Sequence, residues 1–137
     1  MSFSDAYEVD VLKAITGQAT TILTTTPLAH VYVALFTGTL SGDTPGTEVT
    51  GGSYARVDAI GKFATPSSGS VSNNATITFP TATGAWSSGA ALTHFGLFDA
   101  STSGNALGYG NLTDQTKTVG NGDTVSMASS ALTITLD

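Results

Sequence analysis

The stretch Ala91-Leu92-Thr93-His94-Phe95-Gly96-Leu97-Phe98-Asp99 predicts a β-strand that is apolar on both faces. Successive side chains of a strand point to opposite faces, so residues two apart share a face. The two sets are Leu92, His94, Gly96 and Phe98, and Thr93, Phe95 and Leu97. A strand with two apolar faces is covered on both sides, which favours an inner strand of a sandwich.

The rest of the chain predicts further short strands separated by turns. The candidate strands cover residues 30–36, 54–60, 75–79, 106–112, 117–119, 124–128 and 132–136. Residues 106–112 follow a hairpin loop, so we expect them to return antiparallel to the central strand, with Phe95 or Phe98 lying over Gly108 and Gly110. The predicted fold is one mainly β domain over residues 1–137. It is an antiparallel sandwich or barrel of about seven or eight strands over residues 28–137.

Residues 5–16 predict an N-terminal α-helix. Its apolar residues recur at helical spacing and are Tyr7, Val11, Leu12 and Ile15. Gly17 is placed to end the helix. A single amphipathic helix of this length is marginal in water, so it must pack on another element. Two interpretations stay open: the helix lies on its own sheet, or it is an arm that docks on a neighbouring subunit.

Residues 37–52 contain five glycines and no sustained period, which predicts a long surface loop. The loop carries Asp43 and Glu48, but the carboxylate spacing of a calcium-binding loop is missing, so we expect no metal there. Tyr54 and Arg56 follow on one strand face. They are either contact anchors or a core tyrosine beside a solvated arginine.

Trp86, the only tryptophan, lies in a turn region of small residues. It is either a plug over the end of the sandwich or an exposed binding anchor. His94 lies in the middle of the apolar strand, which predicts a hydrogen-bonded core or boundary histidine, not a catalytic base or a zinc ligand.

Charged residues make up only 10% of the chain, against about 25% in ordinary domains, and the net charge is −6. The four basic residues are scattered singly, so a nucleic-acid partner is not expected. No apolar run is long enough to span a membrane, and no basic N-terminal segment predicts a secretory signal. The surface must be covered by small and hydroxyl-bearing residues, which favours self-association or docking because interface cores are also depleted in charge.

Motifs for catalysis are missing from the sequence. The chain has no nucleophile elbow, no HExxH and no phosphate-binding loop, and it contains no cysteine. We therefore expect no enzyme activity and no cofactor.

Five segments resemble a group of small virion proteins of tailed bacteriophages and prophages. They are VYVALFT at 31–37, GTEVTGGSYAR at 46–56, ITFPTA at 77–82, THFGLFDA at 93–100 and LTI at 132–134. The resemblance covers nearly the whole chain in the same order. It implies a structural protein at the surface of the phage particle, made in the bacterial cytoplasm. Members of the group are often labelled tail fibres, and similar small β proteins decorate or cement phage capsids.

Two functions follow from this resemblance. The first, which we favour, is a capsid decoration or cement protein. It would bind coat subunits as a trimer or other homo-oligomer through the helix and the 37–52 loop. The second is a tail-fibre or receptor-binding module, in which Trp86, Tyr54 and Tyr109 would stack on a host-surface glycan or contact a protein. The candidate interface residues are Tyr7, Val11, Glu48, Tyr54, Arg56 and Trp86.

Overall fold

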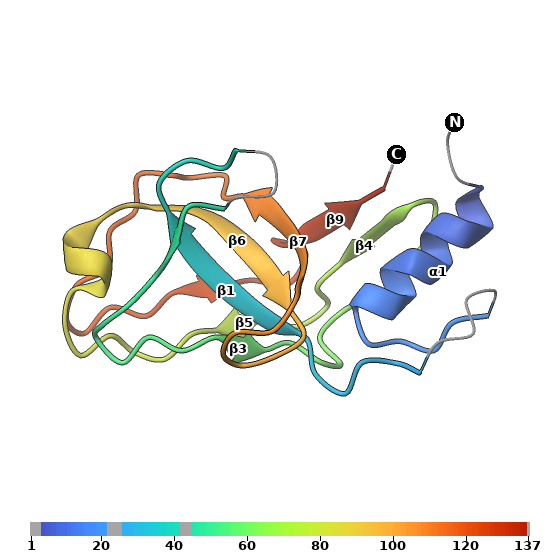
Figure 1. Ribbon diagram of the computed structural model, residues 1–137, viewed down its shortest axis with the longest axis horizontal. Helices are drawn as coiled ribbons and strands as arrows, with labels where there is room; N and C mark the ends of the chain where they lie inside the picture. The colour runs from blue at the N-terminus through green and yellow to red at the C-terminus, as the bar shows by residue number, and fades with distance from the viewer. Residues whose placement is uncertain (1–3, 22–25, 42–44, 137) are drawn as a thin grey trace. The chain divides into compact units, whose positions relative to one another are not determined.

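The structure is a computed structural model that describes residues 4–21, 26–41 and 45–136. Within these residues the protein is mainly β, with nine strands in antiparallel sheets and a single N-terminal α-helix (Figure 1). The elements are α1 (Asp5–Ile15), β1 (Tyr32–Thr37), β2 (Thr47–Glu48), β3 (Val57–Asp58), β4 (Ser70–Ser72), β5 (Ile77–Thr78), the 3-10 turn η1 (Trp86–Gly89), β6 (Leu92–Phe98), β7 (Ala106–Asn111), β8 (Ser126–Met127) and β9 (Thr133–Thr135). The described strands form open sheets, with no closed barrel among them.

The chain packs as two compact units, each assembled from segments far apart in the sequence. The first unit comprises residues 1–31, 59–77 and 127–137, and the second comprises residues 32–58 and 78–126. Neither unit is a continuous piece of chain. The single domain expected for residues 1–137 stays a prediction.

Strand β6 is an inner strand of the larger sheet, as its two apolar faces predict. The strand order is β2-β1-β6-β7, with β3 also paired to β1. β1 pairs antiparallel with one edge of β6, from Tyr32↔Phe98 to Phe36↔His94, and β7 pairs antiparallel with the other. Leu92, His94 and the last three residues of β6 are buried, while the residues between are half-buried. The prediction of an inner strand and of its antiparallel return is therefore confirmed.

The two faces of this sheet are filled in different ways. One face holds an apolar cluster of buried Ala34, Phe36 and Phe98 with half-buried Tyr32 and Tyr109. On the other face the ring of Phe95 lies over the backbone of Gly110, where an added Cβ would come within 2.6 Å of the ring. Glycine at position 110 is thus required by this close approach, as the sequence pattern predicted. The same prediction for Gly108 is wrong, because a Cβ added there would meet nothing within 4 Å.

Helix α1 belongs to the first unit, where it lies against β4 (Figure 1). Its C-terminal end is fixed by Gly17, whose φ is +73°; the N–H groups of Gly17 and Gln18 donate to the carbonyl oxygens of Ala14 and Lys13. These two bonds form a Schellman motif. The helix buries Leu12 completely. The packing matches the first of the two interpretations, a helix that lies on its own sheet.

Several predicted strand boundaries are wrong. The predicted strand 54–60 is paired only at β3, because Gly51, Gly52 and Ser53 all have left-handed φ values and carry the turn up to Tyr54. Residues 117–119 accept hydrogen bonds from Leu92 and from Trp86, in the turn η1, but form no ladder. Conversely, β2 lies inside the predicted 37–52 loop, and β4 lies between the predicted strands 54–60 and 75–79, where no strand is predicted.

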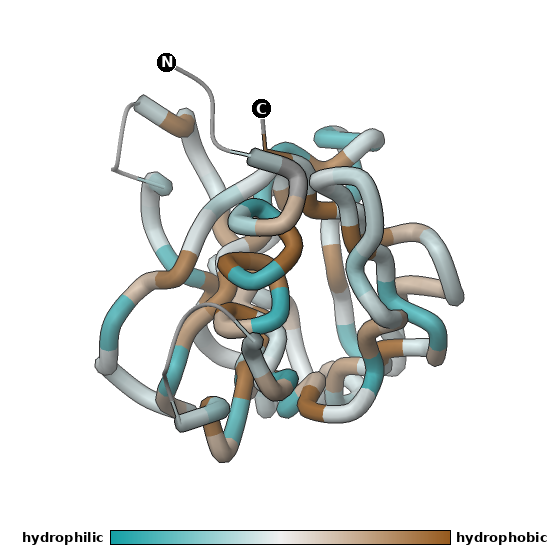
Figure 2. Tube along the Cα trace, turned by 90° about the vertical axis from the view of Figure 1, so that its right-hand side faces the viewer, coloured by the Kyte–Doolittle hydropathy of each residue, from teal (hydrophilic) through white to brown (hydrophobic). Residues whose placement is uncertain are grey.

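Hydrophobic residues are spread along the trace in short runs between polar and near-neutral residues (Figure 2). No helix among the described residues combines the length and the apolar character needed to cross a bilayer. The dispersion fits a fold built from strands of two to seven residues, in which only one face of most strands is buried.

Asn73 joins three segments of the first unit. It is 1% exposed, and its side-chain nitrogen donates to the carbonyl oxygens of Ala75 and Ala128 at 2.9 and 2.8 Å. Its side-chain oxygen accepts a 2.9 Å bond from the N–H of Leu132. The Ala128 carbonyl also accepts from the N–H of Ala131, so removing the amide would leave two backbone groups, the Ala75 carbonyl and the Leu132 N–H, without this partner.

We expect Asn73→Ala to lower the free energy of unfolding by about 3 kcal/mol, since the Leu132 N–H and the Ala75 carbonyl lose their partner. Urea unfolding followed by circular dichroism measures this change. Asn74→Ala is the matched control, because Asn74 is exposed and its side chain makes a long 3.4 Å bond to the carbonyl oxygen of Phe63. Equal losses in both variants would contradict the role of Asn73.

Candidate functional site

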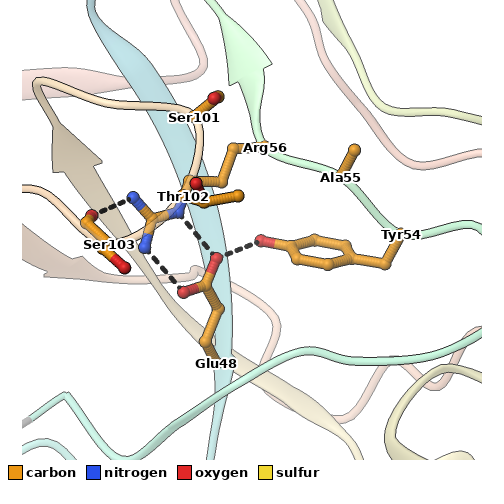
Figure 3. A pocket seen from close by; sticks show the side chains of 7 residues that line it. All are labelled: Glu48, Tyr54, Ala55, Arg56, Ser101, Thr102 and Ser103. Atoms are coloured by element: carbon orange, nitrogen blue, oxygen red, sulfur yellow. Dashed lines mark hydrogen bonds and ion pairs between the residues drawn. The ribbon is translucent and has the colours of Figure 1, made fainter.

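The guanidinium of Arg56 is the centre of a polar site in the second unit (Figure 3). Nε and Nη2 each donate at 2.8 Å to one carboxylate oxygen of Glu48, so the ion pair is bidentate. Nη1 donates at 2.8 Å to the carbonyl oxygens of both Ala100 and Ser103. The central carbon of the guanidinium lies 3.8 Å from the ring centroid of Phe98. The Arg56 side chain is therefore held on all sides and is only 5% exposed.

A gap in the pairing of β1 positions the other residues of the site. β2 and β3 occupy the same edge of β1 and leave Leu35 between them. The N–H of Leu35 donates to the hydroxyl of Tyr54 at 2.9 Å, and its carbonyl accepts from the N–H of Val49 at 2.9 Å. The Tyr54 hydroxyl also donates to Glu48 at 3.3 Å. Tyr54 thus replaces a strand partner and links the sheet edge to the ion pair.

The site opens into a shallow pocket of about 260 Å³. Its lining residues are Glu48, Tyr54, Ala55, Arg56, Ser101, Thr102 and Ser103. Four of the five guanidinium N–H groups already have acceptors, and the Glu48 carboxylate neutralises the charge. The geometry consequently fits a buttress between β2, β3 and the loop 99–105 better than a site that attracts a free anion.

Hydrogen bonds and burial shift the pKa values of these groups. The contact with Glu48 raises the pKa of Arg56 above its ordinary value. Burial raises the pKa of the Tyr54 hydroxyl, and the nearby Glu48 carboxylate adds to the rise. Hydrogen bonds from the side chain and backbone of Asn105 hold the pKa of Asp99 below its ordinary value, and these bonds also close the loop whose carbonyls bind Arg56.

Trp86 lies in the interior of the second unit, not at its surface. It is fully buried, and its indole nitrogen donates to the carbonyl oxygen of Gly52 at 3.0 Å. Its ring meets Tyr54 edge-on at 5.2 Å and Phe79 edge-on at 6.4 Å. The exposed binding anchor considered for Trp86 is therefore wrong for this structure, because its ring has no free face. The turn 51–53 and Trp86 instead form one hydrogen-bonded core element.

His94 differs from its prediction. The ring is 2% exposed, as expected of a core residue, but neither ring nitrogen has a hydrogen-bond partner among the described residues. Its strand neighbours in the ladders are Phe36 on β1 and Asn111 on β7. The sequence predicts a hydrogen-bonded histidine, and this part of the prediction is wrong. A buried imidazole without partners lowers stability relative to an apolar side chain of similar size.

The remaining candidate residues lie elsewhere. Tyr7 and Val11 are half-buried on α1, in the first unit, whereas Glu48, Tyr54 and Arg56 come together in the second. Asp43 lies outside the described residues. No group of three potential metal ligands lies together in the part of the chain that the structure describes.

The sequence does not single out the loop residues 100–103, whose backbone and hydroxyls complete the site. Their only signal is the hairpin composition after the central strand. That composition predicts a turn, but not the Arg56 side chain beside it. The pairing of Arg56 with Glu48 also depends on β2 and β3 sharing one edge of β1, which no local pattern encodes.

Fold and site together define a small, mainly β protein in which the Arg56–Glu48 cluster is engaged with its own framework. The family described as podophage GP4 fiber I protein gp80 matches residues 2–135. The chain therefore belongs to this family of phage virion structural proteins, as its resemblance to phage proteins predicts. No curated protein matches the chain.

We expect Arg56→Lys to lower the free energy of unfolding by about 2 kcal/mol, because an ammonium cannot bind both carboxylate oxygens and two carbonyls at once. Lys117→Arg is the control, since Lys117 is 74% exposed and its pairing with Asp114 contributes little. Urea unfolding compares the two variants. A loss no larger than that of the control would refute the buttress role.

We expect His94→Leu to raise the free energy of unfolding by about 1 kcal/mol, because leucine of similar volume removes two unpaired buried nitrogens. His94→Ala should lower it by about 2 kcal/mol or more, since the truncation leaves a cavity. Thermal unfolding of the three proteins separates the effects. If His94→Leu is clearly destabilising, the imidazole has a hydrogen-bond partner and the interpretation is wrong.

Proposed function

We propose that this protein is a non-enzymatic assembly subunit of a phage fibre, which binds other virion proteins and does not itself stack on a host glycan. The observation that carries the proposal is the match to a family described as a podophage fibre protein, which spans residues 2–135. Fold alone does not fix a function, so the proposal also depends on how the surface and the aromatic side chains are used.

The aromatic residues considered for glycan stacking are engaged inside the protein. Trp86 is fully buried. The Tyr54 ring stacks on Phe79 at 6.3 Å, and its hydroxyl is hydrogen-bonded to the sheet edge. Tyr109 meets Phe36 edge-on at 5.9 Å within the apolar cluster. Stacking on a sugar requires an open ring face, so these contacts favour assembly over receptor binding.

The charge distribution supports a protein partner over a nucleic acid. Lys13, Arg56 and Lys117 each lie within 4 Å of a carboxylate, and the net charge of the chain is −6. Phosphate binding needs clustered, available cations. Small and hydroxyl-bearing side chains cost little to desolvate against another protein, which suits docking in many symmetric copies.

Capsid decoration is the second candidate, favoured by the same low-charge surface. A decoration protein binds coat subunits through such a surface and needs no ligand pocket, and the shallow, neutralised pocket at Arg56 is consistent with this. The two candidates differ only in the virion protein that is bound.

We expect gold-labelled antibody against this protein to bind the fibres of intact phage particles and to leave the heads unlabelled. Negative-stain electron microscopy gives the label position directly. Phage particles that lack the protein are the control for antibody specificity. Label spread over the heads would establish decoration and overturn the fibre assignment, and label on neither would overturn both.

A further inference from the structure

Strand β7 ends the larger sheet. In the order β2-β1-β6-β7 it has β6 on one side, and no described strand pairs with its other edge (Figure 1). β7 covers six residues, one of the longer strands of the fold, and its four inner residues are half-buried. An edge strand of this length presents a row of backbone donors and acceptors to any strand that can approach it.

The hydrogen-bond pattern shows which groups face outward. The N–H of Leu112 donates to the carbonyl of Thr93, so the backbone groups of Leu112 point toward β6. Antiparallel pairing alternates along the strand, so the backbone N–H and C=O groups of Gly110 and Gly108 point toward β6. The backbone groups of Tyr109 and Asn111 point away from it. No backbone hydrogen bond among the described residues engages the outward groups of Tyr109.

The sequence of β7 lacks the features that usually protect an edge. Residues 100–113 contain no charged residue and no proline. Natural edge strands are commonly blocked by lysine, by proline or by an inward charge. One irregularity occurs near Leu107, where Leu97 pairs with Gly108 and Phe98 with Ala106, so the rest of the strand runs in regular register. The nearest carboxylates along the chain are Asp99 and Asp114, which are held in local bonds with Asn105 and Thr116.

One position on this strand is also open in space. A Cβ added to Gly108 would meet nothing within 4 Å, and its φ lies outside the left-handed region. Gly108 therefore leaves the face opposite Tyr109 flat and accessible. Gly110 beside it is covered by the Phe95 ring, so only position 108 accepts a side chain without strain in the single chain.

We propose that the free edge of β7 pairs antiparallel with β7 of a second copy of this chain, about a two-fold axis at Tyr109. In this register Tyr109 faces Tyr109 of the second copy, and the outward groups of each strand meet those of the other. The uncharged edge favours a second copy, because two chains of net charge −6 can meet here without opposing like charges. A charged partner would gain no electrostatic attraction from this edge, because residues 100–113 carry no charge. The inference goes beyond the proposed function, since it holds for a fibre subunit and for a decoration protein alike.

The test uses the purified full chain in sedimentation equilibrium, with Gly108→Lys and Gly108→Glu. Each variant places like charges diagonally across the two-fold axis, so each should weaken dimer formation by about tenfold. Mixing the two variants in equal amounts should restore dimers, because a lysine then lies diagonally across the axis from a glutamate. Ser129→Lys and Ser129→Glu are controls with the same change in net charge at an exposed residue of the other unit.

Amide hydrogen exchange of the wild-type chain gives a second readout that needs no variant. The Tyr109 N–H should exchange more slowly as protein concentration rises, since pairing buries it. A wild-type chain that is monomeric at every concentration, or dimers that persist in both Gly108 variants, would overturn the proposal. If Gly108→Lys and Gly108→Glu are each folded and monomeric, and if their mixture is also monomeric, the two-fold pairing is overturned. Both results are independent of where antibody labels the virion.

Discussion

The bidentate contact between Arg56 and Glu48 is the constraint on which the second unit depends. It fixes β2 to the start of β3, and through the carbonyls of Ala100 and Ser103 it also fixes the loop that follows the central strand. One cation thus satisfies acceptors from two segments and joins them to its own, so three separate parts of the sequence are held together. A chain with so few charged residues uses this one to order its framework, which leaves little net charge at the site for an outside ligand.

The aromatic side chains of the second unit are likewise engaged with one another inside the protein. Tyr54, Phe79 and Trp86 form one ring cluster under the turn at residues 51–53, while Phe36, Phe98 and Tyr109 form another on the face of the larger sheet. Side chains that could have been offered to a receptor are used to build a core from short strands. The exposed surface is left to small and hydroxyl-bearing residues, which is typical of proteins that assemble.

Much of the fold follows from the sequence. The two apolar faces of residues 92–98 predicted an inner strand, and Gly110 predicted the close approach of Phe95. The Arg56–Glu48 pair and the hydroxyl of Tyr54 at the edge of β1 did not follow, because they depend on which strands meet, and strand pairing is a long-range choice that local patterns do not record. His94 shows the other limit: an apolar pattern predicts burial, but not whether a polar ring finds a partner.

The discontinuous make-up of the first unit bears on the order of folding during synthesis. Helix α1 and β4 leave the ribosome early, but β4 pairs with β9, and Ser72 meets Thr133 from 61 positions further along the chain. The side chain of Asn73 likewise cannot accept its hydrogen bond until Leu132 has been synthesised. Such non-local closure is slow, and the early segments must stay unfolded or protected until the last strand is made.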